Sequence, residues 1–516
     1  MKMRIVLEGV GAAFLLLLPL VFGFIDPSHL ELYHEPLPVT NLIGGFLLDV
    51  VCFSILAMAF LVAVEHLPKI LQRTLFALVA SVILWRVLDQ ASRMQKNLRV
   101  SLYWNHARSE ICIAMLLLSG LLACFRPRIT EPLVRIIRVV VASFAFSALW
   151  IVPQLVLIAM AGEPHAAAKP SLQSPDADNT PRRRIIWILF DELSYDQTFD
   201  HPAPGIKLPN FDRLRTESVS FSNLTPVGYD TDRIIPSLLL GRRINDIRST
   251  IAGDLWFRDE NQGRWVVYNP NETLFGVARQ NGWNSGVDGW YNPYCRTFAA
   301  LLNACSWEPT RTLPVELYGA SEERSVLANA VALPYAFVAA KVNETTAKRT
   351  ANIQQYRQIM VHAQALIDDP QIQFAFIHLP VPHPPGIYDR NTHTLRPAGT
   401  YLDNLVLSDD TLGQLLQDIA ATPSSRKTTV IVSSDHSWRV PKWRYSEFWS
   451  DEDEAASGGR FDQRPFLLIH FPGQTSVNQV NAVLPELIEH DMIAGMLLGK
   501  INDPQDLTAF LPPSAR

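Results

Sequence analysis

Acidic residues and histidines follow three apolar segments of this chain, and these side chains are the best candidates for chemistry. The segments span residues 185–190, 374–377 and 429–432, and the polar residues after them are Asp191, Glu192, His378, His383, Asp435 and His436. Carboxylate and imidazole groups are ligands for Zn²⁺, Mn²⁺ or Mg²⁺. A single acid at the end of a strand is more often a helix cap or a turn residue. Three such groups after three apolar segments therefore indicate a divalent metal site.

Short apolar segments separated by helical patterns predict the fold that positions these residues. The segments 184–190, 374–377, 429–432 and 466–469 have the length and composition of strands buried on both faces. Helical patterns lie between them at 274–280, 352–368 and 402–419. This alternation predicts a doubly wound, mainly parallel α/β sheet. Because ligands gather at the carboxyl ends of the strands in such sheets, we expect the polar residues to meet there.

The surplus of apolar residues lies almost entirely in the first 161 positions. Five stretches there are long enough, or nearly so, to cross a bilayer, at 5–24, 42–64, 70–88, 111–125 and 136–161. Lys2 and Arg4 before the first stretch also fit a signal peptide, but four further stretches follow and no small-residue cleavage site is evident. We therefore predict a five-helix transmembrane domain over residues 1–161. Charged residues such as Glu8 within these spans are expected to pair with other helices or to snorkel.

Basic residues in the loops predict the orientation of this domain in the membrane. Lys2 and Arg4 place the N-terminus inside, and the loops after the second and fourth spans are also basic. Five crossings then place the rest of the chain on the periplasmic or extracellular side of the plasma (inner) membrane. The basic loop 93–108 also lies outside in this topology, either as an exception or as an interfacial segment that contacts lipid headgroups. Residues 162–184 read as a flexible linker to a soluble domain over residues 185–516.

Composition and cysteine content limit the classes of protein to which this chain can belong. The chain has 516 residues, 48% of them hydrophobic, which excludes intrinsic disorder. The net charge of −5 gives no indication of nucleic-acid binding. Cys295 and Cys305 are the two cysteines of the soluble part, which is oxidising if it lies outside. We predict that they form a disulfide.

Seven segments, in family order, resemble motifs of the alkaline phosphatase and sulfatase superfamily, in its membrane-anchored sulfatase-like branch. They are residues 185–192, 209–223, 231–241, 273–283, 376–384, 430–436 and 465–473. Segment 231–241, Thr-Asp-Arg-Ile-Ile-Pro-Ser-Leu-Leu-Leu-Gly, resembles the nucleophile segment, and Asp435–His436 resembles the late metal-ligand pair. The resemblance covers most of residues 184–473. It implies an alkaline phosphatase-like catalytic domain.

The same resemblance points to the nucleophile. In sulfatases the modified residue lies ten positions before the glycine of a Ser-Leu-Leu-x-Gly stretch, which ends here at Gly241, so the matching residue is Thr231. Sulfatases use a formylglycine made from Cys or Ser, with an Arg four positions on. This chain has Thr231 and Ile235 in those places. At these positions the chain therefore resembles phosphodiesterases and phospho-headgroup transferases, and not the enzymes that hydrolyse sulfate esters.

The resemblance also implies roles for the other candidate residues. It implies one divalent ion, Zn²⁺ or Mn²⁺ with Mg²⁺ as an alternative, held by Asp191, Thr231, Asp435 and His436, with Glu192 assisting as the second acid does in some relatives. His383, with His378 as a further candidate, is implied to contact the phosphate or to protonate the leaving group. A turn residue in a Pro-rich loop is the alternative interpretation of His383.

Membrane spans followed by this catalytic domain resemble lipoteichoic acid synthases and phosphoethanolamine transferases. The resemblance implies metal-dependent transfer of a phosphoglycerol or phosphoethanolamine headgroup from a membrane phospholipid to an envelope glycan or lipid acceptor, through a covalent Thr231 intermediate. Anchoring raises the effective concentration of such a donor. Two alternatives stay open: a membrane-anchored phosphodiesterase or phosphatase that uses water, and a non-catalytic envelope assembly protein that retains the fold.

Overall fold

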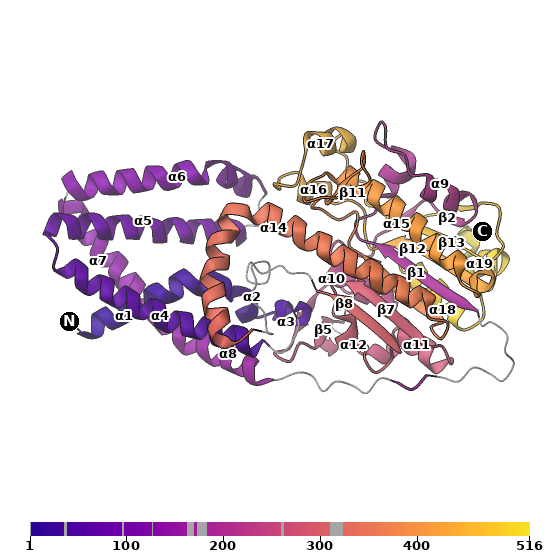
Figure 1. Ribbon diagram of the computed structural model, residues 1–516, viewed down its shortest axis with the longest axis horizontal. Coiled ribbons are helices and arrows are strands. Elements are labelled where there is room, and N and C mark those ends of the chain that lie inside the picture. The colour runs from indigo at the N-terminus through magenta and orange to yellow at the C-terminus, as the bar shows by residue number, and fades with distance from the viewer. Residues whose placement is uncertain are drawn as a thin grey trace. The chain divides into compact units, whose positions relative to one another are not determined.

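The computed structural model describes residues 2–35, 39–94, 98–125, 127–161, 170–172, 183–259, 263–309 and 324–515 (Figure 1). The chain forms two compact units, and both contain segments that are distant in sequence. The membrane unit consists of Met1–Asp26, Pro38–Ala161 and Leu313–Ala339. The catalytic unit consists of Pro27–Leu37, Gly162–Thr312 and Ala340–Arg516. Most of the predicted linker 162–184 lies outside the described residues.

The membrane unit is built from helices. They are α1 (Lys2–Leu17), α2 (Phe22–Ile25), α4 (Thr40–Glu65), α5 (Lys69–Met94), α6 (Leu98–Phe125), α7 (Pro127–Phe144), α8 (Ala148–Ala161) and the first part of α14 (Val326–Asp368). Helix α1 packs against α4 and α7, and α5 packs against α6. Apolar side chains such as Leu117, Leu149 and Met160 are exposed on these helices, as expected of surfaces that face lipid.

Three helices in the described part of the chain are long and apolar enough to cross a membrane, Met3–Leu20, Thr40–Glu65 and Thr130–Ala161. The predicted span 111–125 falls in the shorter apolar helix Glu110–Phe125. The predicted span 70–88 lies within α5, a helix that also carries Arg73, Arg86 and Asp89. The prediction of five spans is therefore not confirmed. The side chains of the basic loop 93–108 lie outside the described residues.

A buried ion pair joins α1 and α7. The Arg138 guanidinium donates to the Glu8 carboxylate, with Nη2 2.6 Å from Oε2. Arg4, one turn earlier on α1, donates to the same carboxylate at 2.6 Å. Since the Glu8 side chain is 3% exposed, the two arginines compensate its charge inside the helix bundle. Glu8 thus forms an interhelical pair.

An eight-stranded sheet forms the centre of the catalytic unit. Its order is β14 (Asn478–Val480), β2 (Val219–Phe221), β13 (Leu467–His470), β12 (Thr428–Ser434), β1 (Arg184–Phe190), β9 (Phe374–Leu379), β7 (Ser285–Trp290) and β8 (Ala304–Glu308). Strand β13 runs antiparallel to both of its neighbours, and the other pairs are parallel. The prediction of a mainly parallel sheet is confirmed.

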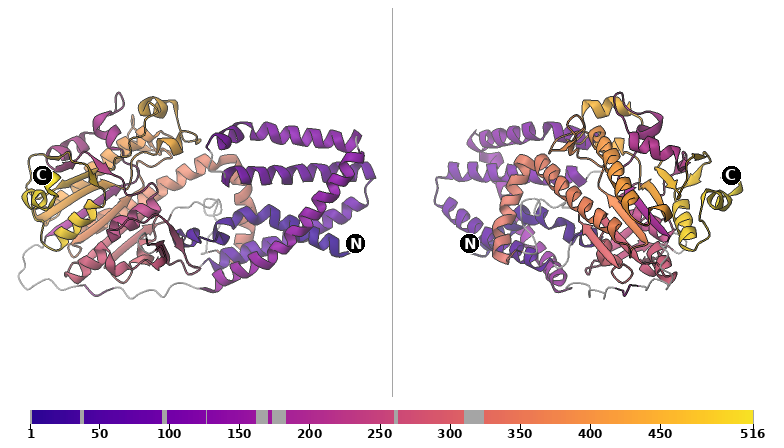
Figure 2. Two further views of the ribbon diagram at one scale, coloured as in Figure 1. Left: turned by 180° about the vertical axis from the view of Figure 1, so that it is seen from behind. Right: turned by 45° about the vertical axis from the view of Figure 1, so that its right-hand side comes forward.

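Side chains alternate along β1 between two hydrophobic cores. Ile185, Trp187 and Leu189 contribute to one core, while Ile186 and Ile188 contribute to the other. Helices therefore cover both faces of the sheet, as in a doubly wound fold (Figures 1 and 2). The helices are α9 (Pro209–Thr216), α10 (Thr231–Leu240), α11 (Leu274–Gln280), α12 (Tyr294–Thr297), the second part of α14, α15 (Tyr401–Ala421), α16 (Val440–Trp443), α17 (Asp451–Ser457), α18 (Ile488–Leu497) and α19 (Pro504–Phe510).

Small sheets complete the catalytic unit. A three-stranded sheet is formed by β4 (Ile247–Ser249), β5 (Leu255–Arg258) and β6 (Trp265–Val267), and two pairs are formed by β10 (Tyr388–Asp389) with β11 (Thr394–Leu395) and by β3 (Leu224–Thr225) with β15 (Leu484–Pro485). A short helix from the loop after the first candidate span, α3 (Leu30–His34), packs against β4. This helix could not be predicted from the sequence, because five residues are too few for a recognisable period.

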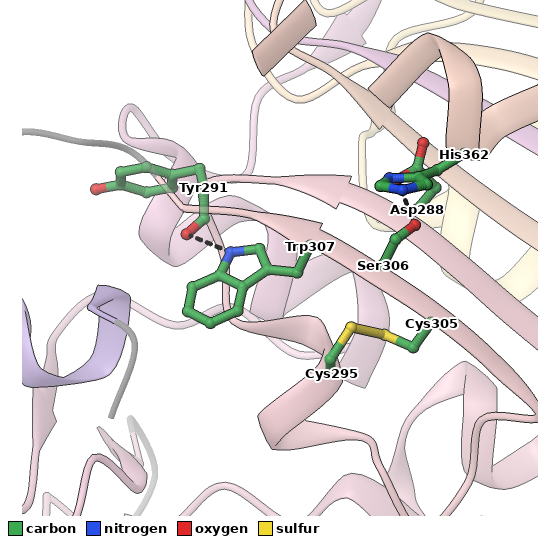
Figure 3. Close-up of a disulfide and its surroundings, with 7 residues drawn as sticks. All are labelled: Asp288, Tyr291, Cys295, Cys305, Ser306, Trp307 and His362. Atoms are coloured by element: carbon green, nitrogen blue, oxygen red, sulfur yellow. Dashed lines mark hydrogen bonds and ion pairs between the residues drawn. A yellow bond between two sulfur atoms is a disulfide. The ribbon is translucent and has the colours of Figure 1, made fainter. Parts of the chain in front are cut away.

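Cys295 on α12 and Cys305 on β8 form a disulfide (Figure 3). The predicted pairing is confirmed. The bond closes a loop with a sequence separation of 10 residues. It ties the segment that follows β7 to the edge strand of the sheet.

Replacing both cysteines with alanine is expected to destabilise the catalytic unit by about 2–3 kcal/mol, because the disulfide lowers the conformational entropy of the unfolded chain and a loop of this size corresponds to about that free energy. The measurement is the thermal unfolding of full-length protein with and without reductant. Reductant should lower the melting temperature of the wild type and leave that of the double variant unchanged. Equal melting temperatures for the oxidised wild type and the double variant would contradict a stabilising role.

Candidate active site

Asp191, Asp435 and His436 meet at the carboxyl ends of two adjacent strands. Strands β1 and β12 pair in parallel register up to Phe190 and Ser434, so the residues that follow lie side by side. One ligand atom from each of the three residues lies within 4.8 Å of the others. The His436 Nε2 atom lies 3.1 Å from Asp435 Oδ2 and 3.7 Å from Asp191 Oδ1. The strand-end prediction is correct for this group.

The chemistry of these three residues fits a divalent cation. All are buried, and both carboxylates are 0% exposed. Among the described residues, Asp191 Oδ1 and Asp435 Oδ2 have no hydrogen-bond donor. Two buried carboxylates side by side are costly without a compensating charge, and a cation between them would supply it. Two oxygens and one imidazole nitrogen are a ligand set typical of Zn²⁺ or Mn²⁺.

Burial determines the protonation of this group in the absence of a cation. It raises the pKa of Asp191, with a further contribution from the neighbouring Asp435. It also raises the pKa of Asp435 to about 6. Burial, and then the Arg439 charge, lower the pKa of His436 well below its ordinary value. His436 is therefore neutral at pH 7 and presents a lone pair, as a metal ligand must.

Thr231 lies beside the group formed by Asp191, Asp435 and His436. It is the first residue of α10, directly after the N-cap residue Asp230. Its Oγ1 atom lies 3.2 Å from His436 Nε2 and 3.5 Å from Asp191 Oδ2. The N-terminus of a ten-residue helix carries a partial positive charge, which favours the ionised form of a hydroxyl and an approaching phosphate. The structure brings the predicted nucleophile to the predicted ligands.

His378 and His383 reach the same region by different routes. His378 is on β9, with Nε2 3.9 Å from Asp191 Oδ2 and Nδ1 2.7 Å from the Tyr294 hydroxyl. It is completely buried, and burial lowers its pKa to about 3. His383 follows β9 and packs edge-on between the indoles of Trp290 and Trp443. Its side chain lines the pocket that contains Thr231, whereas His378 is not among the residues that line this pocket.

Glu192 does not join the metal-ligand group among the described residues. Its carboxylate accepts hydrogen bonds from the Arg439 guanidinium and from Trp443 Nε1, at 2.8 and 2.9 Å for the indole. The backbone at Glu192 is left-handed, with φ of 66°, and this turn directs the carboxylate to Arg439. Its backbone N–H donates to Asp435 Oδ1 at 3.2 Å. The Glu192 carboxylate is thus paired with Arg439, and its role as an assisting ligand stays a prediction.

Arg439 is a site residue that the sequence interpretation missed. Its side chain is 3% exposed. Besides Glu192, its guanidinium contacts the Tyr229 main-chain oxygen at 3.3 Å and Asp230 at 3.6 Å, so it joins the end of β1 to the loop before Thr231. The sequence signal for Arg439 was its place three residues after His436, directly after the uncharged residues Ser437 and Trp438.

A pocket of about 680 Å³ opens over the group. Asp191, Thr231, His383 and Arg439 line it, together with the acids Asp230 and Asp232 on either side of Thr231. Its other walls carry the aromatic residues Trp290, Tyr291, Trp443 and Phe448, the lysines Lys348 and Lys442, and the amides Asn352 and Gln355. The lining therefore combines charged side chains of both signs with aromatic surface.

Solved structures resemble the catalytic unit at low identity. The phosphonate monoester hydrolase of Agrobacterium radiobacter matches with a TM-score of 0.38 and 14% identity, over 65% of this chain and 79% of that one. An alkaline phosphatase superfamily protein from Vibrio parahaemolyticus has a TM-score of 0.35 and 16% identity, over 66% and 73%. Murine ectonucleotide pyrophosphatase/phosphodiesterase 5 has a TM-score of 0.35 and 12% identity, over 61% and 95%. Likenesses at this level carry no argument about substrate.

No curated protein matches the sequence. A family model does match it: the sulfatase model covers residues 183–495, which is more than half of the chain and includes every residue of the site. Members of this family are generally dependent on a divalent metal ion, in agreement with the Asp191, Asp435 and His436 group. The chain therefore belongs to the sulfatase family and is an enzyme of the alkaline phosphatase superfamily.

Proposed function

We propose that this enzyme transfers a phospho-headgroup, of the phosphoglycerol or phosphoethanolamine type, from a membrane phospholipid to an envelope glycan or lipid acceptor. The observation that carries the proposal is the position of the Thr231 hydroxyl, at a helix N-terminus and within 3.5 Å of both Asp191 and His436. Asp191, Thr231, Asp435 and His436 would hold one divalent ion, Zn²⁺ or Mn²⁺. Such an ion, when bound, lowers the pKa of the hydroxyl and neutralises charge on the phosphoryl oxygens.

The proposed reaction has two displacements at phosphorus. In the first, the Thr231 oxygen forms a bond to phosphorus, the bond from phosphorus to the diacylglycerol oxygen breaks, and that oxygen takes up the proton that Thr231 gave up. In the second, an acceptor hydroxyl attacks the Thr231 phosphodiester, and Thr231 regains a proton as the acceptor loses one. His383 lines the pocket, and in the proposed reaction it donates an N–H hydrogen bond to the departing oxygen.

The residues at positions 231 and 235 support phosphoryl over sulfuryl transfer. The apolar helices of the chain support a lipid donor. Position 231 is a threonine, which cannot become the formylglycine of sulfatases, and position 235 is an isoleucine where sulfatases have an arginine. Among the residues that the structure describes, three helices are long and apolar enough to cross a membrane. We place the catalytic unit on the periplasmic or extracellular side. There the anchored site would meet the headgroups of the outer leaflet at high effective concentration.

The test is the mass of the Thr231 peptide. Full-length protein with Zn²⁺ or Mn²⁺ is incubated with phosphatidylglycerol or phosphatidylethanolamine vesicles, quenched in acid and digested. We expect a mass increment equal to one phospho-headgroup on Thr231 with one of the two lipids, together with diacylglycerol release, and neither in Thr231→Ala. Headgroup release at the same rate with or without an acceptor would assign the reaction to a hydrolase. A protein that binds metal but neither gains mass nor releases product would refute both.

A further inference from the structure

The segment between the first two candidate spans is part of the catalytic unit. Pro27–Leu37 belongs to the catalytic unit. The Ser249 N–H at the end of β4 donates to the Ser28 main-chain oxygen at 2.7 Å. Tyr33 on α3 is 3% exposed and belongs to the larger hydrophobic core of this unit. Residues this well packed are built into the fold and do not act as a loose loop.

Arg296 fixes the end of this short helix. Its guanidinium donates to the main-chain oxygens of Leu32 at 3.1 Å and Glu35 at 2.9 Å, and also to that of Tyr33. These are carbonyls that the C-terminus of α3 leaves without helical partners, and the partly buried Arg296 guanidinium satisfies them. Arg296 is itself held in place, because the adjacent Cys295 is bonded to Cys305 on β8.

The last residue of α3 contacts a wall of the active-site pocket. The His34 ring stacks on the Tyr291 ring, with centroids 4.3 Å apart and an angle of 30° between the planes. Tyr291 directly follows β7 and lines the same pocket as Thr231. Burial lowers the pKa of His34 to about 3, so the ring is uncharged at pH 7. The ring therefore acts on Tyr291 as an uncharged aromatic surface that also makes a polar contact with the Tyr291 backbone.

Tyr291 needs such support because its backbone is unfavourable for a side chain. Its φ is 70°, in the left-handed region, which residues with a Cβ adopt when their surroundings enforce it. Its N–H donates to the Glu308 oxygen at 3.1 Å, and its oxygen accepts from Trp307 Nε1 at 3.3 Å (Figure 3). These bonds hold the main chain on the β8 side. The His34 ring holds the side chain.

We propose that His34 is a positioning residue that keeps Tyr291 in place as a substrate-binding wall, so that the loop between the first two candidate spans completes the active-site pocket. The proposal rests on the proposed function for its substrate. Tyr291 and Thr231 line the same pocket, but Tyr291 takes no part in the proposed displacements, so loss of the stack weakens binding of ground state and transition state alike. The consequence is a higher KM at nearly constant kcat.

The test uses full-length protein in detergent, Mn²⁺, and bis(p-nitrophenyl) phosphate as the probe. His34→Ala is expected to raise KM about three- to tenfold and to change kcat by less than about twofold, in line with the energy of one aromatic pair. His34→Phe keeps a flat uncharged ring and should retain the wild-type KM. His201→Ala, at a histidine whose side chain is 61% exposed, is the matched control and should leave both constants unchanged.

Hydrogen exchange of the backbone at residues 289–293 provides a readout that does not need activity. His34→Ala should accelerate this exchange and His34→Phe should not, with His34→Gln as a second ring-free variant if alanine prevents folding. If the wild-type protein shows no activity on the probe, the proposed function fails. Faster exchange in His34→Ala than in the wild type would still support the positioning role of His34. A folded ring-free variant with wild-type exchange and wild-type KM would overturn the proposal.

Discussion

Alanine in place of Thr231 is expected to lower kcat/KM for phosphodiester cleavage by at least about 10³-fold, since it removes the attacking atom of a covalent mechanism. Serine keeps a hydroxyl at the same helix N-terminus and should retain measurable activity. The measurement is kcat/KM of the full-length protein with Zn²⁺ or Mn²⁺. The substitution deletes few atoms from a side chain that is 6% exposed, so the melting temperature of the metal-free protein should change little.

A threonine outside the site is the control for this experiment. Thr216 lies at the end of α9, is exposed, and bonds through its hydroxyl to the Arg213 main-chain oxygen. Thr216→Ala should have wild-type kcat/KM. If Thr231→Ala kept a tenth or more of the wild-type kcat/KM while still binding the metal, Thr231 would not be the nucleophile. The pocket would then need a water molecule in that role.

The metal-ligand group could be predicted because it depends on local patterns and one general rule. The apolar runs before Asp191 and Asp435 identify strands, and parallel strands end at one edge of the sheet. The structure pairs these two strands directly, so the acids become neighbours. Thr231 has no such pattern, since it begins a helix and follows no long strand. Only the resemblance to known motifs located it.

Glu192 and α3 show where the sequence becomes ambiguous. Two adjacent acids after a strand look equivalent, and their difference arises from a left-handed turn at Glu192 and from Arg439, which arrives 247 residues later in the chain. The loop after the first candidate span has no periodicity, and its place in the catalytic unit depends on Arg296 and Tyr291. Contacts at such sequence separation are set by tertiary packing, which propensity does not report.

Chelation of the metal is expected to abolish activity and to lower the melting temperature, with a larger loss at about pH 7.5 than at about pH 5. Without metal, the folded state holds a proton on Asp435, whose pKa is raised to about 6, while the unfolded state releases it near the ordinary value of 3.8. In the metal-free protein, the contribution of Asp435 to the free energy of unfolding therefore falls as the pH rises from 3.8 through about 6. A bound cation reverses the trend, because it requires the ionised carboxylates.

Asp435→Asn separates stability from activity. Asparagine keeps the Oδ1 acceptor for the backbone N–H groups of Glu192 and His436 but carries no charge to bury. The variant should be inactive, should gain no stability from Zn²⁺ or Mn²⁺, and yet should be more stable than metal-free wild type at about pH 7.5, by about 1–3 kcal/mol. Melting curves across pH, with and without chelator, measure all three. A metal-free variant that melts below the metal-free wild type at this pH would show that the carboxylate stabilises the fold by itself, and that a cation is not what the buried acids require.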